Sequence, residues 1–285
     1  MLWDRDHKSS DVEDRRAMGG VRQGGMGILG LLPFAARFGW KGILVFGVLA
    51  GGLYFFGGNI PGLGGAQQGA VTTPNPQEEE LVKFVSFVLD DTQKTWRELM
   101  PGGQYQKAKL IVFRGATESG CGVGQSQMGP FYCPVDKHVY IDLSFYEDLR
   151  SRMGAPGDCA QAYVIAHEIG HHVQNLLGTS DKVHAASAQQ QKGADGLSVK
   201  LELQADCFAG VLAHHAEKRK LLELGDVDEA LGAAAAIGDD RLQKQGQGRV
   251  TPETWSHGSS EQRAFWLKRG MTSGDPAKCD TFSER

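Results

Sequence analysis

Apolar residues recur at helical spacing between residues 159 and 177, where they form a stripe along one face of a helix. The stripe consists of Ile165, Ile169, Val173 and Leu176. Asp158 followed three residues later by Gln161 indicates a capping box at the start of this helix, and Gly178 indicates its end. The pattern predicts a helix that packs one face against a core and leaves the opposite face to line a cleft.

Further elements follow from periodicity and from turn residues. They are a helix over 78–99, a strand over 108–114, a strand over 138–143, a short helix over 144–154, a helix over 197–210 and a helix over 226–243 that is broken or kinked at Gly238. Residues 185–196, rich in Gln, Ala and Gly, are expected to form a loop or a lid. This order predicts an α+β domain that is mainly helical and has a small sheet.

The 159–177 helix carries the sequence His167-Glu168-Ile169-Gly170-His171, which is an HExxH motif. Residues four apart on an α-helix differ by about 40° around its axis, so the two histidines point the same way, one turn apart. This spacing suits two adjacent ligands of a tetrahedral zinc ion, with Glu168 placed as a base for the water beside the metal. The alternative is a chance pattern, because five-residue motifs with two free positions also occur in helices that bind nothing.

A hydrolytic zinc site usually takes three protein ligands, so a third is expected elsewhere in the chain. Helical periodicity over 197–210 places Glu202 and Asp206 on one face, four residues apart. One carboxylate can then bind zinc while the second accepts the N–H of a ligating imidazole and fixes its tautomer. The alternative is a solvated acidic face, which the apolar neighbours of these acids disfavour.

Four motifs, HEIGHHVQ, ELQADCFAG, WSHGSSEQR and GDPAKCDTF, together resemble the bacterial family of putative neutral zinc metallopeptidases over most of residues 78–285. The Glu-x-x-x-Asp spacing after HExxH is also similar to that of the gluzincin proteases, including the integral-membrane CaaX-type proteases. The resemblance implies a zincin or gluzincin-like domain that holds one Zn²⁺ ion through His167, His171 and Glu202. It also makes Asp206 the residue that orients a ligand histidine.

The stretch from His257 to Arg263 resembles the His-Pro…Arg segment of the membrane gluzincins, with the same six-residue step from His to Arg. Gly258 stands where those proteases have proline, which changes the loop. The resemblance implies that His257 donates a hydrogen bond to the tetrahedral intermediate and that Arg263 holds a carboxylate near the metal in bidentate fashion. The alternative is a surface histidine in a Gly/Ser loop and an arginine on a helix surface.

These residues predict a zinc-dependent endopeptidase that acts on a protein or peptide substrate. Zinc polarises the scissile carbonyl and lowers the pKa of its water to about 7, and Glu168 carries the water proton to the leaving amine. One alternative is a membrane-tethered binding or assembly factor with a structural metal, which needs a fourth protein ligand such as His257. The other is a hydrolase of peptidoglycan peptides.

The strand over 138–143 is a candidate for the edge strand that, in gluzincin-like proteases, binds substrate as an added β-strand. The alternative is an ordinary core strand.

The remaining histidines are not assigned to the site. His172 points about 100° away from His171, so we expect it behind the ligands or at the surface. His214 and His215 are expected to be structural or at the surface, close to the basic end of their helix.

The chain is weakly acidic, with a net charge of −4 over 285 residues, which argues against nucleic acid as a partner. Residues 42–60 carry no charge and, at 19 residues, are long enough to span a bilayer. Basic residues precede this segment, and none follows until Lys83. The positive-inside rule then predicts a single-pass protein of the bacterial inner (cytoplasmic) membrane, with its N-terminus in the cytoplasm. A cleaved signal peptide and a buried core helix are the alternatives.

This topology divides the chain into four parts. They are a cytoplasmic tail over 1–37, a transmembrane anchor over 38–60, a flexible linker over 61–77 and a periplasmic or extracytoplasmic zinc metallopeptidase domain over 78–285. The last part is long enough for one domain with a sizeable core. The oligomeric state does not follow from the sequence.

All five cysteines follow the predicted anchor, in a compartment that would then be oxidising. Cys121 and Cys133 flank a short Gly-rich loop and are the expected first disulfide. Cys207 and Cys279 are the expected second pair, which ties the C-terminal residues to the 197–210 helix and leaves Cys159 free. A zinc site built from cysteines is disfavoured, because no C-x-x-C pair occurs.

Overall fold

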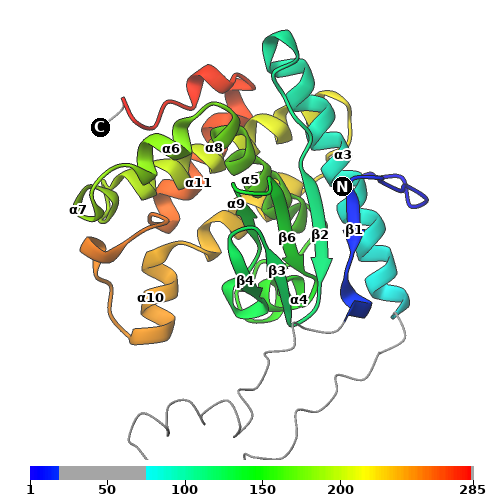
Figure 1. Cartoon of the computed structure of the whole chain (residues 1–285), viewed down its shortest axis with the longest axis horizontal. Coiled ribbons are helices and arrows are strands. Elements are labelled where there is room, and N and C mark those ends of the chain that lie inside the picture. The colour runs from blue at the N-terminus through cyan, green and yellow to red at the C-terminus, as the bar shows by residue number, and fades with distance from the viewer. Residues whose placement is uncertain (19–74, 284–285) are drawn as a thin grey trace, which may run out of the picture. The chain divides into compact units, whose positions relative to one another are not determined.

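A four-stranded sheet with the strand order β1-β2-β6-β5 is the centre of the fold (Figure 1). Its strands are β1 (Val12–Asp14), β2 (Lys109–Phe113), β6 (His138–Asp142) and β5 (Phe131–Cys133). The first three run parallel, and β5 pairs antiparallel with β6. A separate hairpin pairs β3 (Ala116–Ser119) with β4 (Gly122–Gln125). The structure is a computed structural model, and it describes residues 1–18 and 75–283.

Helices account for most of the described residues. They are α3 (Pro76–Leu99), α4 (Ser144–Ser151), α5 (Asp158–Leu176), α6 (Thr179–His184), α7 (Ala188–Gln191), α8 (Leu197–Lys218), α9 (Asp226–Ala236), α10 (Asp239–Gln247) and α11 (Ser260–Ser273). The predicted α+β class, mainly helical with a small sheet, is confirmed. The stretch expected to be a loop or a lid contains α7, whose first turn is capped by Ser187 and Gln190.

Alternate residues of β2 and β6 face two different clusters of apolar side chains. Leu110, Val112, Val139 and Ile141 belong to the large core cluster that also includes α3, α5 and α8 residues. Ile111, Phe113 and Tyr140 belong to a smaller cluster on the other face. Both faces of these strands are therefore buried, which explains their nearly continuous apolar sequence.

Helix α5, which carries the HExxH motif, begins and ends within one residue of its predicted bounds. Gly178 adopts the left-handed conformation that ends it. The predicted capping box is wrong. Gly157 occupies the N-cap position, and Asp158 is the first helical residue. The Asp158 carboxylate lies 2.7 Å from the amino group of Met1 instead of capping its own helix.

The strand β6 pairs with β2 on one side and with β5 on the other. The proposal that residues 138–143 form the substrate-binding edge is therefore wrong, because both hydrogen-bonding edges of this strand are occupied. The edge strands are β1 and β5, and β5 packs against α5. Tyr132 of β5 accepts a hydrogen bond from Asn175 of α5 at 2.9 Å.

The first 18 residues belong to the same compact unit as the helices and strands that follow residue 75. Strand β1 pairs with β2, Trp3 packs edge-on against Phe84 of α3, and His7 contacts Asp90 at 2.9 Å. Residues 1–18 are therefore part of the folded domain and not of a separate tail. Because they share a sheet with the domain, they lie on the same side of any membrane. A cytoplasmic N-terminus combined with an extracytoplasmic domain is thus incompatible with this fold.

Within residues 1–18 and 75–283, no helix has the length and apolar character needed to cross a bilayer. The predicted anchor over 38–60 and linker over 61–77, up to residue 74, lie outside the described residues.

Both predicted disulfides are confirmed. Cys121 is bonded to Cys133, and Cys207 of α8 is bonded to Cys279. Cys159 is free and buried, and burial raises the pKa of its thiol to about 12.

The predicted 226–243 helix is broken near Gly238, as expected, into α9 and α10. Two of its acids, Asp226 and Asp239, are buried, with exposed fractions of 4% and 8%.

Two glycines let α8 and α11 approach each other backbone to backbone. A methyl group added at Gly210 would overlap the carbonyl of Leu267, and one added at Gly270 would overlap the carbonyl of Cys207. This close packing brings α11, which carries Arg263, against α8, which carries Glu202 and Asp206.

We therefore expect Gly210→Ala to destabilise the protein by about 1–3 kcal/mol, because overpacking at a closed helix contact forces the backbones apart. The measurement is the free energy of unfolding in denaturant. The matched control is Gly232→Ala, at an exposed helical position with open space around it. The control should be neutral or stabilising by up to about 1 kcal/mol. Equal effects at the two sites would contradict this account of the packing.

Candidate metal centre

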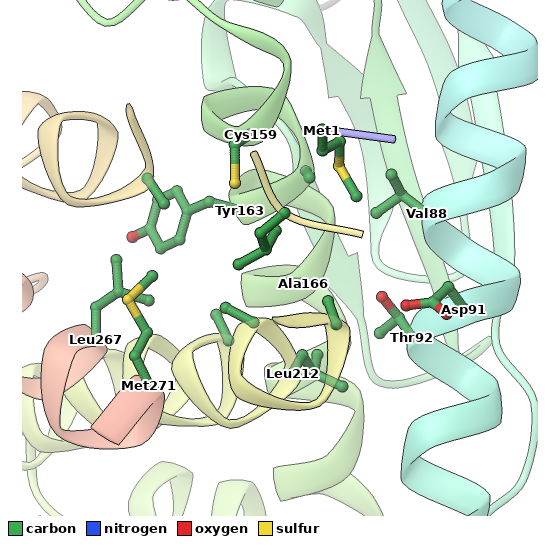
Figure 2. A pocket seen from close by; sticks show the side chains of 16 residues that line it. Met1, Val88, Asp91, Thr92, Cys159, Tyr163, Ala166, Leu212, Leu267 and Met271 are labelled. Atoms are coloured by element: carbon green, nitrogen blue, oxygen red, sulfur yellow. The ribbon is translucent and has the colours of Figure 1, made fainter. Parts of the chain in front are cut away.

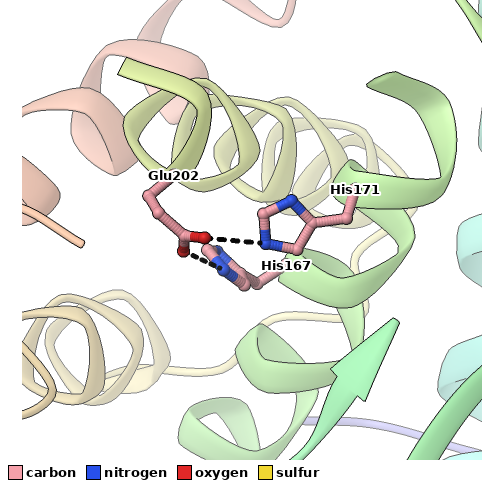
Figure 3. Close-up of side chains that lie close together, drawn as sticks. All are labelled: His167, His171 and Glu202. Carbon is pink, nitrogen blue, oxygen red and sulfur yellow. Dashed lines mark hydrogen bonds and ion pairs between the residues drawn. The ribbon is translucent and has the colours of Figure 1, made fainter. Parts of the chain in front are cut away.

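Three residues from two helices converge on one point (Figure 3). His167 and His171 come from α5, and Glu202 comes from α8. The Nε2 atoms of the two imidazoles lie 3.1 Å and 3.4 Å from the two carboxylate oxygens of Glu202. The helical spacing of four brings the histidines together, and the contact between α5 and α8 supplies the carboxylate.

The geometry fits a tetrahedral zinc ion. Ligands that bind zinc at about 2.0–2.1 Å in a tetrahedron lie about 3.4 Å from one another. Each Nε2 atom lies close to that separation from one oxygen of Glu202: His167 is 3.1 Å from Oε2, and His171 is 3.4 Å from Oε1. The donor set of two imidazoles and one carboxylate is also one that zinc uses in hydrolytic sites.

The charges around this point favour a cation. Burial lowers the pKa of His167, but Asp206 and Glu202 raise it by more, to about 9. Burial also lowers the pKa of His171, and Glu202 reverses that effect so that the net shift is upward. Burial raises the pKa of Glu202, yet the two histidines hold it well below its usual value. Positive charge next to Glu202 is thus stabilised, as the charge of a bound divalent cation would be.

Asp206 orients His167 from behind. Its Oδ1 atom lies 2.8 Å from Nδ1 of His167 and accepts a hydrogen bond from Tyr163 at 2.5 Å. Arg263 donates to both oxygens of Asp206, from Nε at 2.8 Å and from Nη2 at 2.9 Å. Asp206 is fully buried, and Arg263 is 2% exposed. The predicted pairing of Arg263 with a carboxylate near the metal ligands is therefore present, and that carboxylate is Asp206.

His171 has a different partner. Its Nδ1 atom lies 2.9 Å from Oε1 of Gln174, which is on the same helix and fully buried. Both imidazoles therefore have Nδ1 engaged by an oxygen and Nε2 directed to the shared point. This arrangement fixes the tautomer that a metal ligand needs.

Glu168 lies next to the two histidines without joining the cluster of candidate ligands. It is 7% exposed, and burial raises its pKa despite the opposing charges of His171 and His167. A carboxylate with a raised pKa is a better proton acceptor and donor near neutral pH.

His257 is held by Asp239 at the start of α10. Nδ1 of His257 lies 3.1 Å from Oδ1 of Asp239, while Oδ2 accepts the backbone N–H groups of Ser256 and His257 at 2.8 Å and 2.7 Å. The hydrogen bond to Asp239 raises the pKa of His257, and Glu202 adds to the effect. The side chain of His257 is 51% exposed. His257 is thus within electrostatic reach of the cluster and open to solvent.

An apolar cavity of about 50 Å³ lies elsewhere, between α3, α5, α8 and α11 (Figure 2). Its lining includes Cys159, Tyr163 and Leu267 but none of the three candidate ligands. The cavity is therefore distinct from the candidate metal centre.

Sequence reasoning missed two residues of this network and could not place a third. Tyr163 and Gln174 lie four residues before His167 and three residues after His171, on the same helix, so helical spacing could have found them. Asp239 gave no such signal, because only tertiary folding brings it to His257.

The histidines left out of the site lie outside the cluster. His172, expected behind the ligands or at the surface, is fully buried between the carbonyl of Gln106 at 2.6 Å and the hydroxyl of Tyr132 at 3.0 Å, so the surface alternative is wrong. His214 and His215 contact the carbonyls of Met271 and Gly274, which is the structural role expected.

An HExxH helix with a glutamate from a following helix, set in an α+β fold, defines the class of zinc metallopeptidase-like proteins. The chain belongs to the putative neutral zinc metallopeptidase family, whose model matches residues 1–282. The resemblance given by the four sequence motifs is confirmed, and the family implies zinc as the metal.

Relatives of similar sequence occur in bacteria. The chain is 50% identical over 291 residues to the uncharacterized protein YpfJ of Escherichia coli (strain K12), across 100% of the chain and 99% of that protein. It is 47% identical over 199 residues to the uncharacterized protein Rv2575 of Mycobacterium tuberculosis (strain ATCC 25618 / H37Rv), across 66% of each. No solved structure matches the chain.

We expect Arg263→Met to leave Asp206 as an uncompensated buried charge. The loss should be about 3–5 kcal/mol in the free energy of unfolding, and zinc affinity should fall by about 10–100-fold. Denaturant unfolding of the metal-free protein and chelator competition measure the two effects. Lys268→Met, at an exposed position on the same helix, is the control. A control that loses as much as Arg263→Met would show that the ion pair is not the cause.

Proposed function

We propose that the chain is a zinc-dependent endopeptidase that hydrolyses peptide bonds in protein or peptide substrates. One observation carries this proposal. Within the described residues, the cluster offers three protein ligands, and His257 is turned toward Asp239 instead of completing a set of four. A structural zinc site is usually closed by four protein ligands, whereas a catalytic site keeps one position for water or substrate.

The proposed reaction assigns a role to each side chain. A bound zinc ion supplies Lewis acidity, which polarises the carbonyl and lowers the pKa of water to about 7. Glu168 accepts the proton of the attacking water and delivers it to the leaving nitrogen. Asp206 holds His167 in the required tautomer, and Arg263 keeps Asp206 ionised.

His257 is proposed to donate a hydrogen bond to the oxyanion that develops on the carbonyl. Its exposed side chain and its electrostatic contact with Glu202 support this role. Asp239 accepts the N–H of Nδ1, so Nε2 is a donor when the imidazole is protonated.

Strand β5 is the proposed docking edge for the substrate backbone. Within the described residues, its second edge pairs with no strand, and β5 packs against α5, the helix that carries His167 and His171. An extended peptide could add to this edge by main-chain hydrogen bonds.

The same observations give less support to the two alternative functions. A structural metal in an assembly factor would leave the buried Glu168 without a role. Hydrolysis of peptidoglycan peptides would use the same residues, so it differs from the main proposal only in substrate.

Membrane attachment through residues 42–60 stays a prediction, but a single crossing does not fit it, because β1 pairs with β2 and so residues 1–18 and the domain lie on one side. The disulfides support an oxidising compartment for that side. Fractionation of bacteria that produce the full chain, or a chain lacking residues 42–60, tests attachment. Only the full chain should sediment with membranes, and recovery of both proteins in the soluble fraction would refute the anchor.

We expect Glu168→Gln to lower peptide hydrolysis by about 10²–10⁴-fold, because the amide cannot accept the water proton. Zinc content should not change, since Glu168 is outside the ligand cluster. The measurement is mass-spectrometric detection of fragments from a complex peptide mixture treated with the zinc-loaded full chain. Glu217→Gln, at an exposed position of α8, is the control and should keep full activity. Full activity in Glu168→Gln would contradict the proposed mechanism.

We expect Asp239→Asn to move the alkaline limb of the kcat/KM profile to lower pH. Asp239 raises the pKa of His257, so the protonated donor persists to higher pH in the wild type and is lost earlier in the variant. The pH–rate profile measures this shift. Asp240→Asn is the matched control, because Asp240 contacts Ser260 and not His257. Superimposable profiles for wild type and Asp239→Asn would exclude His257 from the titrating step.

A further inference from the structure

We propose that Gln174 and Gln204 are positioning residues that couple the metal ligand His171 to the Cys207–Cys279 disulfide. The proposal rests on the zinc site described above and not on peptidase activity. Its consequence is a zinc affinity that depends on the oxidation state of one disulfide.

The two ligand histidines are supported in different ways. His167 is oriented by a charged group, Asp206, which is held by Arg263. His171 is oriented by the neutral amide of Gln174. A neutral amide has a donor end as well as an acceptor end, so its orientation depends on what the donor end binds.

A chain of hydrogen bonds settles that orientation. Gln174 Nε2 donates to the carbonyl of Leu201 at 2.6 Å and to Oε1 of Gln204 at 3.2 Å. Gln204 Nε2 donates in turn to the carbonyl of Cys279 at 2.9 Å. Backbone carbonyls can only accept, so the carbonyl at each step fixes the direction of the amide that binds it. Oε1 of Gln174 is therefore presented to His171, whose Nδ1 carries the proton and whose Nε2 faces the metal.

This chain of hydrogen bonds, from His171 through Gln174 and Gln204 to the carbonyl of Cys279, is called the relay below. Its far end is held by the disulfide. Cys279 follows the short turn after α11, outside any helix or strand, and its bond to Cys207 fastens it to α8, one residue after Asp206. Thr281 adds a hydrogen bond to the carbonyl of Lys200 at 2.6 Å, and both Cys279 and Thr281 are buried. Opening the disulfide removes the covalent constraint on the Cys279 carbonyl, whereas α8 and α11 still pack through Gly210 and Gly270.

Loss of the Cys279 carbonyl frees the amide of Gln204 to rotate, and Gln174 then loses one of its two fixed partners. His171 is held less firmly in the tautomer that binds zinc. Outer partners of metal ligands affect affinity by about 10–100-fold, and we expect the remote end of the relay to contribute about tenfold.

The test is the zinc dissociation constant of the full chain, measured by competition with a chromogenic chelator. The variants are Gln204→Met and the double substitution Cys207→Ser with Cys279→Ser. The matched control is Cys121→Ser with Cys133→Ser, which removes the other disulfide. The visible spectrum of the Co²⁺-loaded protein is recorded for each variant as a measure of ligand geometry.

We expect both relay changes to weaken zinc binding about tenfold and to alter the Co²⁺ spectrum, and we expect the control to do neither. Combined in one protein, the two relay changes should be non-additive, because they interrupt the same path. Additive losses, unchanged affinities or an equal loss in the control would overturn the proposal. If the serine variants do not fold, mild phosphine reduction of the wild type should give the same tenfold loss, and unchanged affinity after reduction would overturn it.

His171→Ala separates this proposal from the one on which it rests. If that variant binds zinc as tightly as wild type, both the proposed metal site and the relay are wrong. If it loses zinc while the relay variants keep theirs, the relay alone is wrong.

Discussion

The buried ion pair between Asp206 and Arg263 is the interaction on which the rest of the site depends. It joins α8 to α11, and through His167 and Tyr163 it also fixes α5. A charge pair this deeply buried is stable only when the remaining donors and acceptors are satisfied. Here the hydroxyl of Tyr163 and the carbonyl of Ile237 complete the set. The same carboxylate that neutralises the arginine therefore also holds His167, one of the three candidate metal ligands.

The close contact of α8 with α11 brings the two residues of this ion pair together. The glycines at positions 210 and 270 let the two backbones approach closely enough for Arg263 to reach Asp206. On the other side of the cluster, the neutral path through Gln174 and Gln204 ends at the C-terminal disulfide. One ligand histidine thus depends on the helix core and the other on the C-terminal segment.

Much of the site could be predicted from the sequence, because helical periodicity alone brings His167 to His171 and Glu202 to the same face as Asp206. The features that could not be predicted depend on tertiary pairing. Strand β5 is three residues long and does not alternate, so its place at the edge of the sheet, which makes β6 central, has no local signal. The role of β1 was missed for the same reason. Asp239 lies 18 residues before His257, on the far side of a helix and a loop, and only their folding joins them.

The central claim is that two histidines and one glutamate hold zinc and leave one position open. X-ray absorption spectroscopy at the zinc edge of the full chain tests it most directly. The account predicts two imidazole nitrogens at about 2.0–2.1 Å, one carboxylate oxygen at about 2.0–2.2 Å and one exchangeable oxygen from water. The imidazole signal should fall in His171→Ala. A shell with sulfur at about 2.3 Å, or with four protein ligands and no water, would contradict the account.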